Sequence, residues 1–208
     1  MTKAISLHKI RPITEAKRGA MRILGLDPGS RVAGWGLIEK TGSKLSYLAS
    51  GVLRFEACES DFLKRFVYFR KLTLEVIHEY RPDVAVFESL IFKKNPNSLI
   101  KLAQSRGAML ASVSELEGIQ VHEYSPNLVK STLTGYGHSD KEGIQKVLGM
   151  LLGIKEFSTH DESDALAIAM CHAILGSQAV SSQVASSKGG GRRKSRSLQH
   201  SLEHRIKG

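Results

Sequence analysis

The chain has 208 residues, of which 41% are hydrophobic and 24% charged, and its formal net charge is +10. This length and composition are typical of one globular domain with additional segments, and no stretch approaches the roughly 18 consecutive apolar residues of a membrane span. The two cysteines lie far apart without metal-ligand spacing, which excludes a disulfide scaffold and a zinc site; we expect a soluble, cytoplasmic protein that does not bind membranes.

The positive charge is concentrated at the two ends of the chain. Residues 1–20 contain five basic residues and one acidic residue, and residues 186–208 contain seven basic residues and one acidic residue. The sequence between these segments is therefore neutral overall. Basic arms of this kind commonly bind a polyanion without reading its sequence, and nucleic acid is the usual partner. A solvated tail without a partner is the alternative.

Changes in composition and periodicity divide the chain into three parts. Residues 1–20 show no sustained period and are predicted to be a flexible basic extension. Residues 21–176 alternate apolar runs with helical patterns and are predicted to form the folded domain. From residue 177 to residue 208 the sequence is Ser- and Gly-rich and then basic, which is typical of a disordered tail.

The first half of the domain predicts a strand meander, a helix and another strand. Asp-Pro-Gly and Thr-Gly-Ser turn sequences separate three apolar runs, which predicts antiparallel strands at 23–26, 32–40 and 45–55. Ser60 is a candidate N-cap for a helix that must end before Pro82. Residues 83–88 form a short apolar run that ends in an acid, as the first strand does.

The second half of the domain is mainly helical. A helix predicted at 96–116 carries small residues at intervals of four: Ala103, Gly107 and Ala111. Such a face allows close approach either by a second copy of the chain or by the protein's own sheet. A short strand is predicted at 120–124. Further helices are predicted to begin near Pro126, Ser139 and Thr159, the last two with capping-box sequences.

Acidic residues end both strands that can lie parallel. If the helix between them is a crossover connection, Asp27 and Glu88 become neighbours at one edge of the sheet. Asp161 and Asp164 lie three residues apart, so they share one face at the start of the last helix. The apolar sequence that follows them predicts a helix buried against the sheet. We therefore expect these two acids to face the strand ends.

Four carboxylates that meet at one edge repel one another unless cations neutralise them. Hard oxygen ligands suit Mg²⁺, with Mn²⁺ as a substitute, and no cluster of His and Cys competes for a softer metal. Two such ions, about 3.5 to 4 Å apart, hold the attacking water and the leaving oxygen in phosphodiester cleavage. The sequence therefore predicts a metal-dependent nuclease whose metal ligands are Asp27, Glu88, Asp161 and Asp164.

Several short stretches, in this order and spacing, resemble the bacterial RuvC Holliday-junction resolvases. The resemblance covers about residues 21–175 and rests on 25–36, Glu88 with Lys94-Asn95, 102–107, Val129-Lys130, 135–141 and 161–167. It implies an α/β, ribonuclease H-like fold, with a five-stranded mixed sheet of three antiparallel and then two parallel strands, flanked by helices. It also implies a Mg²⁺-dependent homodimer that nicks four-way junction DNA symmetrically in recombination and repair, beside a branch-migration motor.

The resemblance assigns roles to individual side chains. The four acids match the catalytic, metal-binding carboxylates of the family. Lys130 and Lys141 match lysines that contact DNA near the scissile phosphate, and their ammonium groups suit the charge that develops there. Lys94 and Arg106 lie in matching stretches and are predicted to contact DNA as well.

One position departs from the family pattern. The family usually has a phenylalanine three residues after its second acid, where it is implicated in unstacking bases at the junction centre. Here that position is Ile91, and the aromatic residue is Phe92. Either side chain can serve as an apolar wedge between bases, so both are predicted DNA contacts.

Three alternative functions remain open from the sequence. An actin-like or sugar-kinase-like phosphotransferase also opens on an Asp-x-Gly turn, although its two halves need a longer chain. A ribonuclease H-like nuclease that acts on structured RNA would share the fold. A binding module without catalysis would depend on the basic arms for its whole activity.

Overall fold

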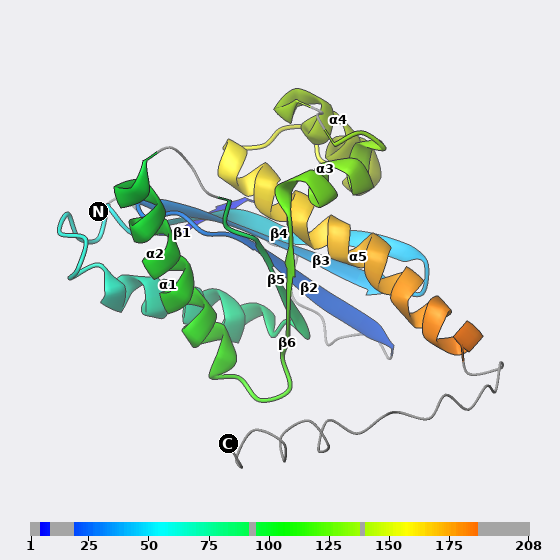
Figure 1. Ribbon diagram of the computed structural model, residues 1–208, viewed down its shortest axis with the longest axis horizontal. Helices are drawn as coiled ribbons and strands as arrows, with labels where there is room; N and C mark the ends of the chain where they lie inside the picture. The colour runs from blue at the N-terminus through cyan, green and yellow to red at the C-terminus, as the bar shows by residue number, and fades with distance from the viewer. Residues whose placement is uncertain (1–4, 9–18, 92–94, 138–139, 187–208) are drawn as a thin grey trace, which may run out of the picture. The chain divides into compact units, whose positions relative to one another are not determined.

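A mixed β-sheet lies between two groups of helices in the computed structural model (Figure 1), which describes residues 5–8, 19–91, 95–137 and 140–186. Within these residues the sheet has six strands in the order β1-β4-β3-β2-β5-β6. The strands are β1 (Ile5–His8), β2 (Ala20–Asp27), β3 (Val32–Thr41), β4 (Lys44–Arg54), β5 (Val84–Glu88) and β6 (Gln120–Tyr124).

The strand pairing confirms the predicted mixed sheet. β2, β3 and β4 pair antiparallel, β5 pairs parallel with β2, and β6 pairs parallel with β5. The β3–β4 hairpin turns at Gly42, whose φ of 60° lies in the left-handed region that glycine adopts without steric cost. The central strands β2 and β5 thus run side by side and end at the same edge.

Five helices are present in the described part of the chain, and they cover both faces of the sheet (Figure 1). They are α1 (Phe66–Tyr80), α2 (Pro96–Ser114), α3 (Pro126–Thr134), α4 (Lys141–Leu152) and α5 (His160–Ser186). None of these helices combines the length and the apolar character that a membrane span requires. Contacts group the chain into two units, Met1–Gly176 and Ser177–Gly208.

Alternation along the strands builds a separate core on each face. Leu24, Leu26 and Trp35 pack with α1 and α2, whereas Ile23 and Ile38 pack with the helices of the other face. The first core is aromatic, with the Phe55 and Phe69 rings 4.5 Å apart in an edge-to-face arrangement, and the second core consists mainly of aliphatic and small side chains. Period-two burial of this kind fixes the strand register.

Two described segments outside the predicted folded domain have regular secondary structure. Ile5–His8 lie in the segment predicted to be a flexible extension, yet they form β1, which pairs antiparallel with β4. Ile-Ser-Leu-His alternates apolar and polar residues as a strand does, and β4 offers free backbone groups along its outer edge. The last helix continues beyond 176 to Ser186 because Ser177–Ser186 contains no Pro or Gly. The predicted tail from 187 to 208 lies outside the described residues.

The starts of two helices also differ from prediction. Asp61 accepts hydrogen bonds from the backbone N–H groups of Leu63 and Lys64, at 2.9 and 3.1 Å, and this closes a separate turn. α1 therefore begins at Phe66 and not at Ser60. Asp140 caps α4 by accepting from the Gly143 N–H at 2.8 Å, while the predicted cap Ser139 lies outside the described residues.

His172 is a buried titratable residue where α5 contacts the edge strand β6. Its Nδ1 lies 3.0 Å from the Tyr124 hydroxyl, and its ring centroid lies 4.5 Å from that of His122. Burial, followed by the charges of His122 and Lys40, lowers the pKa of His172 to about 4. The neutral imidazole is therefore the form that the folded protein favours.

This depressed pKa predicts a pH-dependent stability. Because the unfolded chain takes up the proton near pH 6.5 and the folded chain near pH 4, folding loses free energy as the pH falls between these values. Between pH 7.5 and 5.5 the loss attributable to this residue is about 1 kcal/mol. Urea unfolding of the wild type and of His172→Gln at both pH values measures it. Parallel pH dependences in the two proteins would contradict the assignment.

Candidate active site

Asp27 and Glu88 lie side by side at the carboxyl ends of the central strands. The parallel register pairs Leu26 of β2 with Phe87 of β5, so the next residue of each strand is one of the two acids. Both side chains are only partly exposed. The sequence-based expectation that a strand end presents each acid at the same sheet edge is therefore confirmed.

Glycines on β2 and β3 allow α5 to lie directly against the sheet. A Cβ atom at Gly34 would lie 1.8 Å from the backbone oxygen of Asp161, and one at Gly25 would lie 2.0 Å from that of Ala165. Gly34 is also the antiparallel partner of Asp27. The backbone of Asp161 thus occupies the space beside the residue that pairs with Asp27. This close approach brings the start of α5 to the strand ends.

The first turn of α5 presents Asp161 and Asp164 on one side. Both acids are partly exposed, whereas Glu162 and Ser163 between them are buried, each with 1% relative exposure. Residues three apart lie on one face of a helix, as predicted. All four predicted acids therefore come from three elements that meet at one sheet edge: β2, β5 and the N-terminus of α5.

Charge repulsion shows that the four carboxylates form one electrostatic cluster. The pKa of Asp27 is raised to about 8, first by burial and then by the charges of Asp164, Glu88 and Asp161, while Lys141 acts in the opposite direction. Burial, followed by the charge of Asp164, also raises the pKa of Asp161. A cluster of this kind is stabilised by any cation that enters it.

Lys141 supplies a positive charge at this cluster. Its Nζ donates a hydrogen bond to Asp164 Oδ2 at 3.0 Å, and this bond raises the pKa of the lysine. Because Asp140 is the N-cap of α4, Lys141 is the first residue of that helix, with its side chain at the acids. Lys130 lies on α3 and is partly exposed; its contact with DNA stays a prediction.

The turn that follows Asp27 is held by a buried arginine. The Arg65 guanidinium donates to the carbonyl oxygens of Ser30, Glu59 and Ser60 at 2.7 to 2.8 Å, and the residue has 5% relative exposure. These bonds tie the Asp-Pro-Gly-Ser turn to the segment before α1. Arg65 therefore helps to fix the direction in which β2 presents its acid.

The four carboxylates are ligands that suit a hard cation. Four carboxylates offer oxygen ligands only, and their mutual repulsion favours binding of a divalent ion. Among the described residues, no group of three or more His, Cys, Asp or Glu side chains is already arranged to hold a metal. Asp164 is instead paired with the Lys141 ammonium, which supplies the positive charge in this arrangement.

The other predicted DNA contacts have different environments. Ile91 has 49% relative exposure shortly after Glu88, as a side chain that meets DNA requires. Phe92 and Lys94 lie outside the described residues. The contact of Arg106 with DNA stays a prediction; within the protein its guanidinium pairs with Glu123 and lies over the Phe87 ring, 5.4 Å from the centroid. Arg106 thus joins α2 to β5 and β6, and its side chain is only 15% exposed.

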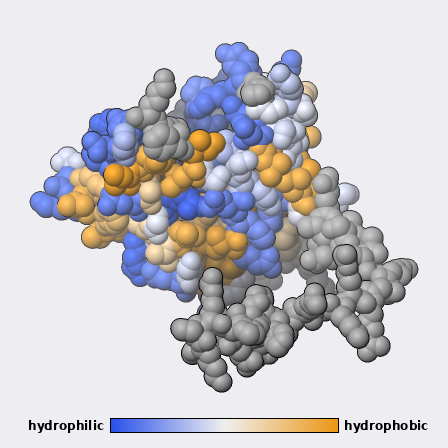
Figure 2. Space-filling model, in the orientation of Figure 1, coloured by the Kyte–Doolittle hydropathy of each residue, from blue (hydrophilic) through white to orange (hydrophobic). Residues whose placement is uncertain are grey.

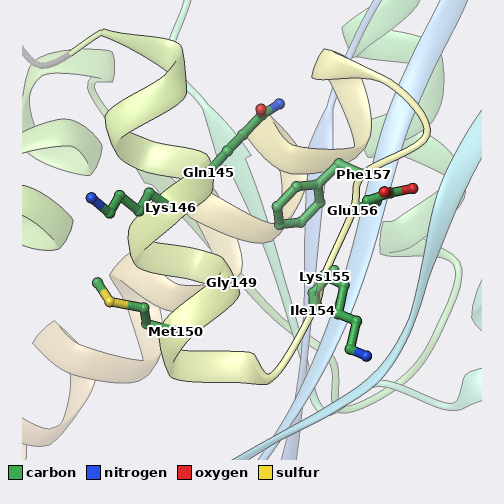
Figure 3. A pocket seen from close by; sticks show the side chains of 8 residues that line it. All are labelled: Gln145, Lys146, Gly149, Met150, Ile154, Lys155, Glu156 and Phe157. Carbon is green, nitrogen blue, oxygen red and sulfur yellow. The ribbon is translucent and has the colours of Figure 1, made fainter.

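A hollow of about 610 Å³ lies beside α4 (Figure 3), and none of the four acids lines it. Its lining comes from α4 and the segment before α5, and the Phe157 ring extends toward α4 in this view. The residues that line it are Gln145, Lys146, Gly149, Met150, Ile154, Lys155, Glu156 and Phe157. Gln145, at one side of this hollow, donates a hydrogen bond to the Ser163 hydroxyl in the first turn of α5.

A mixed sheet with this strand order, together with a carboxylate cluster at the ends of its central strands, agrees with the ribonuclease H-like nuclease that the sequence predicts. The family model for crossover junction endodeoxyribonuclease RuvC matches residues 23–172. The chain belongs to this family.

Individual relatives agree with this assignment. The crossover junction endodeoxyribonuclease RuvC of Ruegeria pomeroyi is 42% identical over 163 residues, which is 78% of this chain and 97% of the relative. A solved structure of Thermus thermophilus RuvC in complex with a Holliday junction substrate has a TM-score of 0.70 and 31% identity, and the match covers 76% of this chain and 96% of that chain. The yeast mitochondrial resolvase Ydc2 shares the fold, with a TM-score of 0.57, 16% identity, and 76% and 80% of the two chains covered.

Sequence reasoning missed the residues that seat the acids. Gly25 and Gly34 lie inside strands, where glycine is unfavourable unless another backbone approaches closely. A glycine in a predicted strand could therefore have indicated the close approach of α5. Arg65 gave no such signal, because an arginine in a polar segment is ordinarily solvated. Glu162 was predicted only as the partner of Thr159 in a capping box, which does not reveal its bond to Ser50. Their roles depend on partners 35 and 112 positions away in the sequence.

Proposed function

We propose that the chain is a Mg²⁺-dependent endonuclease that resolves Holliday junctions by paired, symmetric nicks in DNA recombination and repair. The observation that carries this proposal is the convergence of Asp27, Glu88, Asp161 and Asp164 in a chain of the RuvC family. The complex of Thermus thermophilus RuvC with a Holliday junction substrate supports the choice of substrate. The phosphotransferase and RNA-directed alternatives are not favoured by the comparisons.

The four acids would hold two Mg²⁺ ions, with Mn²⁺ as a substitute. When bound, such ions generate the attacking hydroxide and neutralise the leaving oxygen of an in-line phosphodiester cleavage. Burial of Asp27 limits solvent screening, which strengthens each charge interaction at the site. Lys141, whose ammonium pairs with Asp164, would stabilise negative charge on the cleaved phosphate.

A second copy of the chain completes the enzyme. The row of small residues on α2, Ala103, Gly107 and Ala111, is exposed and does not pack against the protein's own sheet, and a Cβ atom at Gly107 would meet nothing within 4 Å. Val67 on α1 and Ile100 on α2 are exposed apolar side chains, and Figure 2 shows apolar surface over this part of the molecule. Symmetric cleavage of two strands requires two such sites, which a homodimer supplies.

A junction substrate also accounts for the basic terminal segments and for an additional protein partner. The basic segments at 1–20 and 186–208 suit the phosphate backbone of the junction arms and would add salt-dependent affinity without base selectivity. We expect the activity to be cytoplasmic, a compartment in which cysteines such as Cys58 and Cys171 stay reduced. A branch-migration motor that moves the junction past the cleavage site is the expected partner.

The proposal is tested by cleavage of a synthetic mobile four-way junction, with and without Mg²⁺, beside a linear duplex and a structured RNA. We expect paired nicks with 5′-phosphate and 3′-hydroxyl ends in the junction, only when the metal is present. Preferred cleavage of the RNA would favour the RNA-directed alternative. Junction binding without any metal-dependent nick would favour a binding module, and ATP turnover without nicks would favour a phosphotransferase.

A further inference from the structure

Glu162 is a buried acid that stands between two catalytic acids without facing them. Its Oε1 accepts a hydrogen bond from the Ser50 hydroxyl at 2.6 Å, and its Oε2 accepts from the Ser158 backbone N–H at 2.7 Å. The Ser50 hydroxyl in turn lies 2.9 Å from the Tyr47 hydroxyl. The carboxylate thus links the first turn of α5 to β4 and to the segment before the helix.

Ser163 anchors the same turn on another side. Its hydroxyl accepts a hydrogen bond from Gln145 of α4 at 3.0 Å and donates to the His160 carbonyl at 2.8 Å. Glu162 and Ser163 are equally buried, each with 1% relative exposure. The two residues between the acids therefore hold the helix to two different elements, β4 and α4.

Because Glu162 and Ser163 belong to the same helical turn as Asp161 and Asp164, the contacts that hold them also determine where the two acids lie. Successive residues of an α-helix are rotated by about 100°, so Asp161 and Asp164 project to one side while Glu162 and Ser163 project elsewhere. A small rotation of this turn about its axis moves both acids together relative to Asp27 and Glu88. Whatever fixes the rotation also fixes the spacing of the ligand oxygens.

We propose that Glu162, held by Ser50, is a positioning residue that sets the rotation of the first turn of α5 and thereby the metal affinity of Asp161 and Asp164. The proposal rests on the proposed metal-dependent nuclease function. Burying a carboxylate is costly unless hydrogen bonds satisfy it, and the described partners of Glu162 are hydroxyl and backbone N–H groups. Glu162 links the first turn of α5 to β4, whereas Asp161 and Asp164 would be the residues that hold the metal ions.

Ser50→Ala is the decisive variant, because it removes the link and leaves the charge of every acid unchanged. Loss of a residue that orients a metal ligand typically lowers affinity by about 10- to 100-fold. We expect the Mg²⁺ concentration for half-maximal junction cleavage to rise by at least about 10-fold, and Mg²⁺ affinity measured by calorimetry to fall by the same factor. Junction affinity without metal should stay at the wild-type value.

Control variants separate positioning from general destabilisation and from charge. Val76→Ala removes buried volume on the opposite face of the sheet, so it should lower the melting temperature without changing the Mg²⁺ midpoint. Glu156→Gln removes an exposed charge near the start of α5 and should leave the midpoint within about twofold of the wild type. Should Ser50→Ala fail to fold, Tyr47→Phe tests the same link one contact further away.

Two results would overturn the inference. The first is a Ser50→Ala protein that melts lower, as Val76→Ala does, while its Mg²⁺ affinity stays at the wild-type value. The second is a wild-type protein that shows no Mg²⁺ binding by calorimetry, which would remove the ligand set itself. If the wild type binds Mg²⁺ but does not cut junctions, the proposed substrate fails, whereas the calorimetric comparison still decides the role of Glu162.

Discussion

Replacing Asp27 by Asn should lower Mg²⁺-dependent junction cleavage by well over 100-fold while leaving junction binding intact. Loss of a group that only orients a metal ligand costs about 10- to 100-fold, and Asp27 is a predicted ligand itself. Its burial at the centre of the acid cluster means that a neutral amide removes both an oxygen ligand and the charge that attracts the ions. Initial cleavage rates at saturating Mg²⁺, together with gel-shift affinity in its absence, measure the two effects.

The same variant should be more stable than the wild type without metal. Burial and three neighbouring acids raise the pKa of Asp27 to about 8, so at neutral pH the chain must take up a proton at Asp27 when it folds, and the amide removes this cost. Mg²⁺ should raise the melting temperature of the wild type but not of the variant, because binding to the native state stabilises it. Glu117→Gln, an exposed carboxylate in the α2–β6 connection, is the matched control and should behave as wild type. Normal cleavage by Asp27→Asn would contradict the assignment of Asp27 as a metal ligand.

The sequence predicted the acids and the sheet because both follow from local patterns. β2 and β5 are short apolar runs that end in an acid, and the helix between them allows a parallel pair, so the meeting of Asp27 with Glu88 needed no knowledge of side-chain packing. The positions of Asp161 and Asp164 followed from helical spacing and from the apolar residues after them. The resemblance to RuvC then joined these separate patterns into one site.

What the sequence could not supply depends on contacts between distant segments. Arg106 carries a positive charge in a stretch that matches a DNA-binding family, and its guanidinium also pairs with Glu123 and lies over the Phe87 ring of the same chain. The hydrogen bond between Lys141 and Asp164 joins residues 23 positions apart and depends on the way α4 meets α5. Neither charge pattern nor periodicity encodes such pairings, because each depends on the completed packing of helices against the sheet.

The close contact between α5 and β3 can be tested by adding one methyl group at Gly34. Gly34→Ala should destabilise the fold by about 3 kcal/mol or more, since overpacking a tight contact typically costs 1 to 3 kcal/mol. The new Cβ would lie 1.8 Å from the Asp161 oxygen and 2.4 Å from its carbonyl carbon, and backbone atoms cannot rotate away as a flexible side chain can. The helix must therefore shift at the turn that carries two acids.

Gly34→Ala should also lower junction cleavage, because it displaces the helical turn that carries Asp161 and Asp164. A misplacement of about 1 Å at a reacting centre costs on the order of 100-fold in rate, so Gly34→Ala should be nearly inactive even at temperatures where it remains folded. Gly176→Ala is the matched control on the same helix, because its Cβ would make ordinary contacts of 3.5 to 3.8 Å with the His172 ring. That variant should gain up to about 1 kcal/mol from helix propensity and keep full activity. Equal stability and activity for the two alanine variants would show that α5 does not rest on Gly34, and that the acids reach the strand ends in another way.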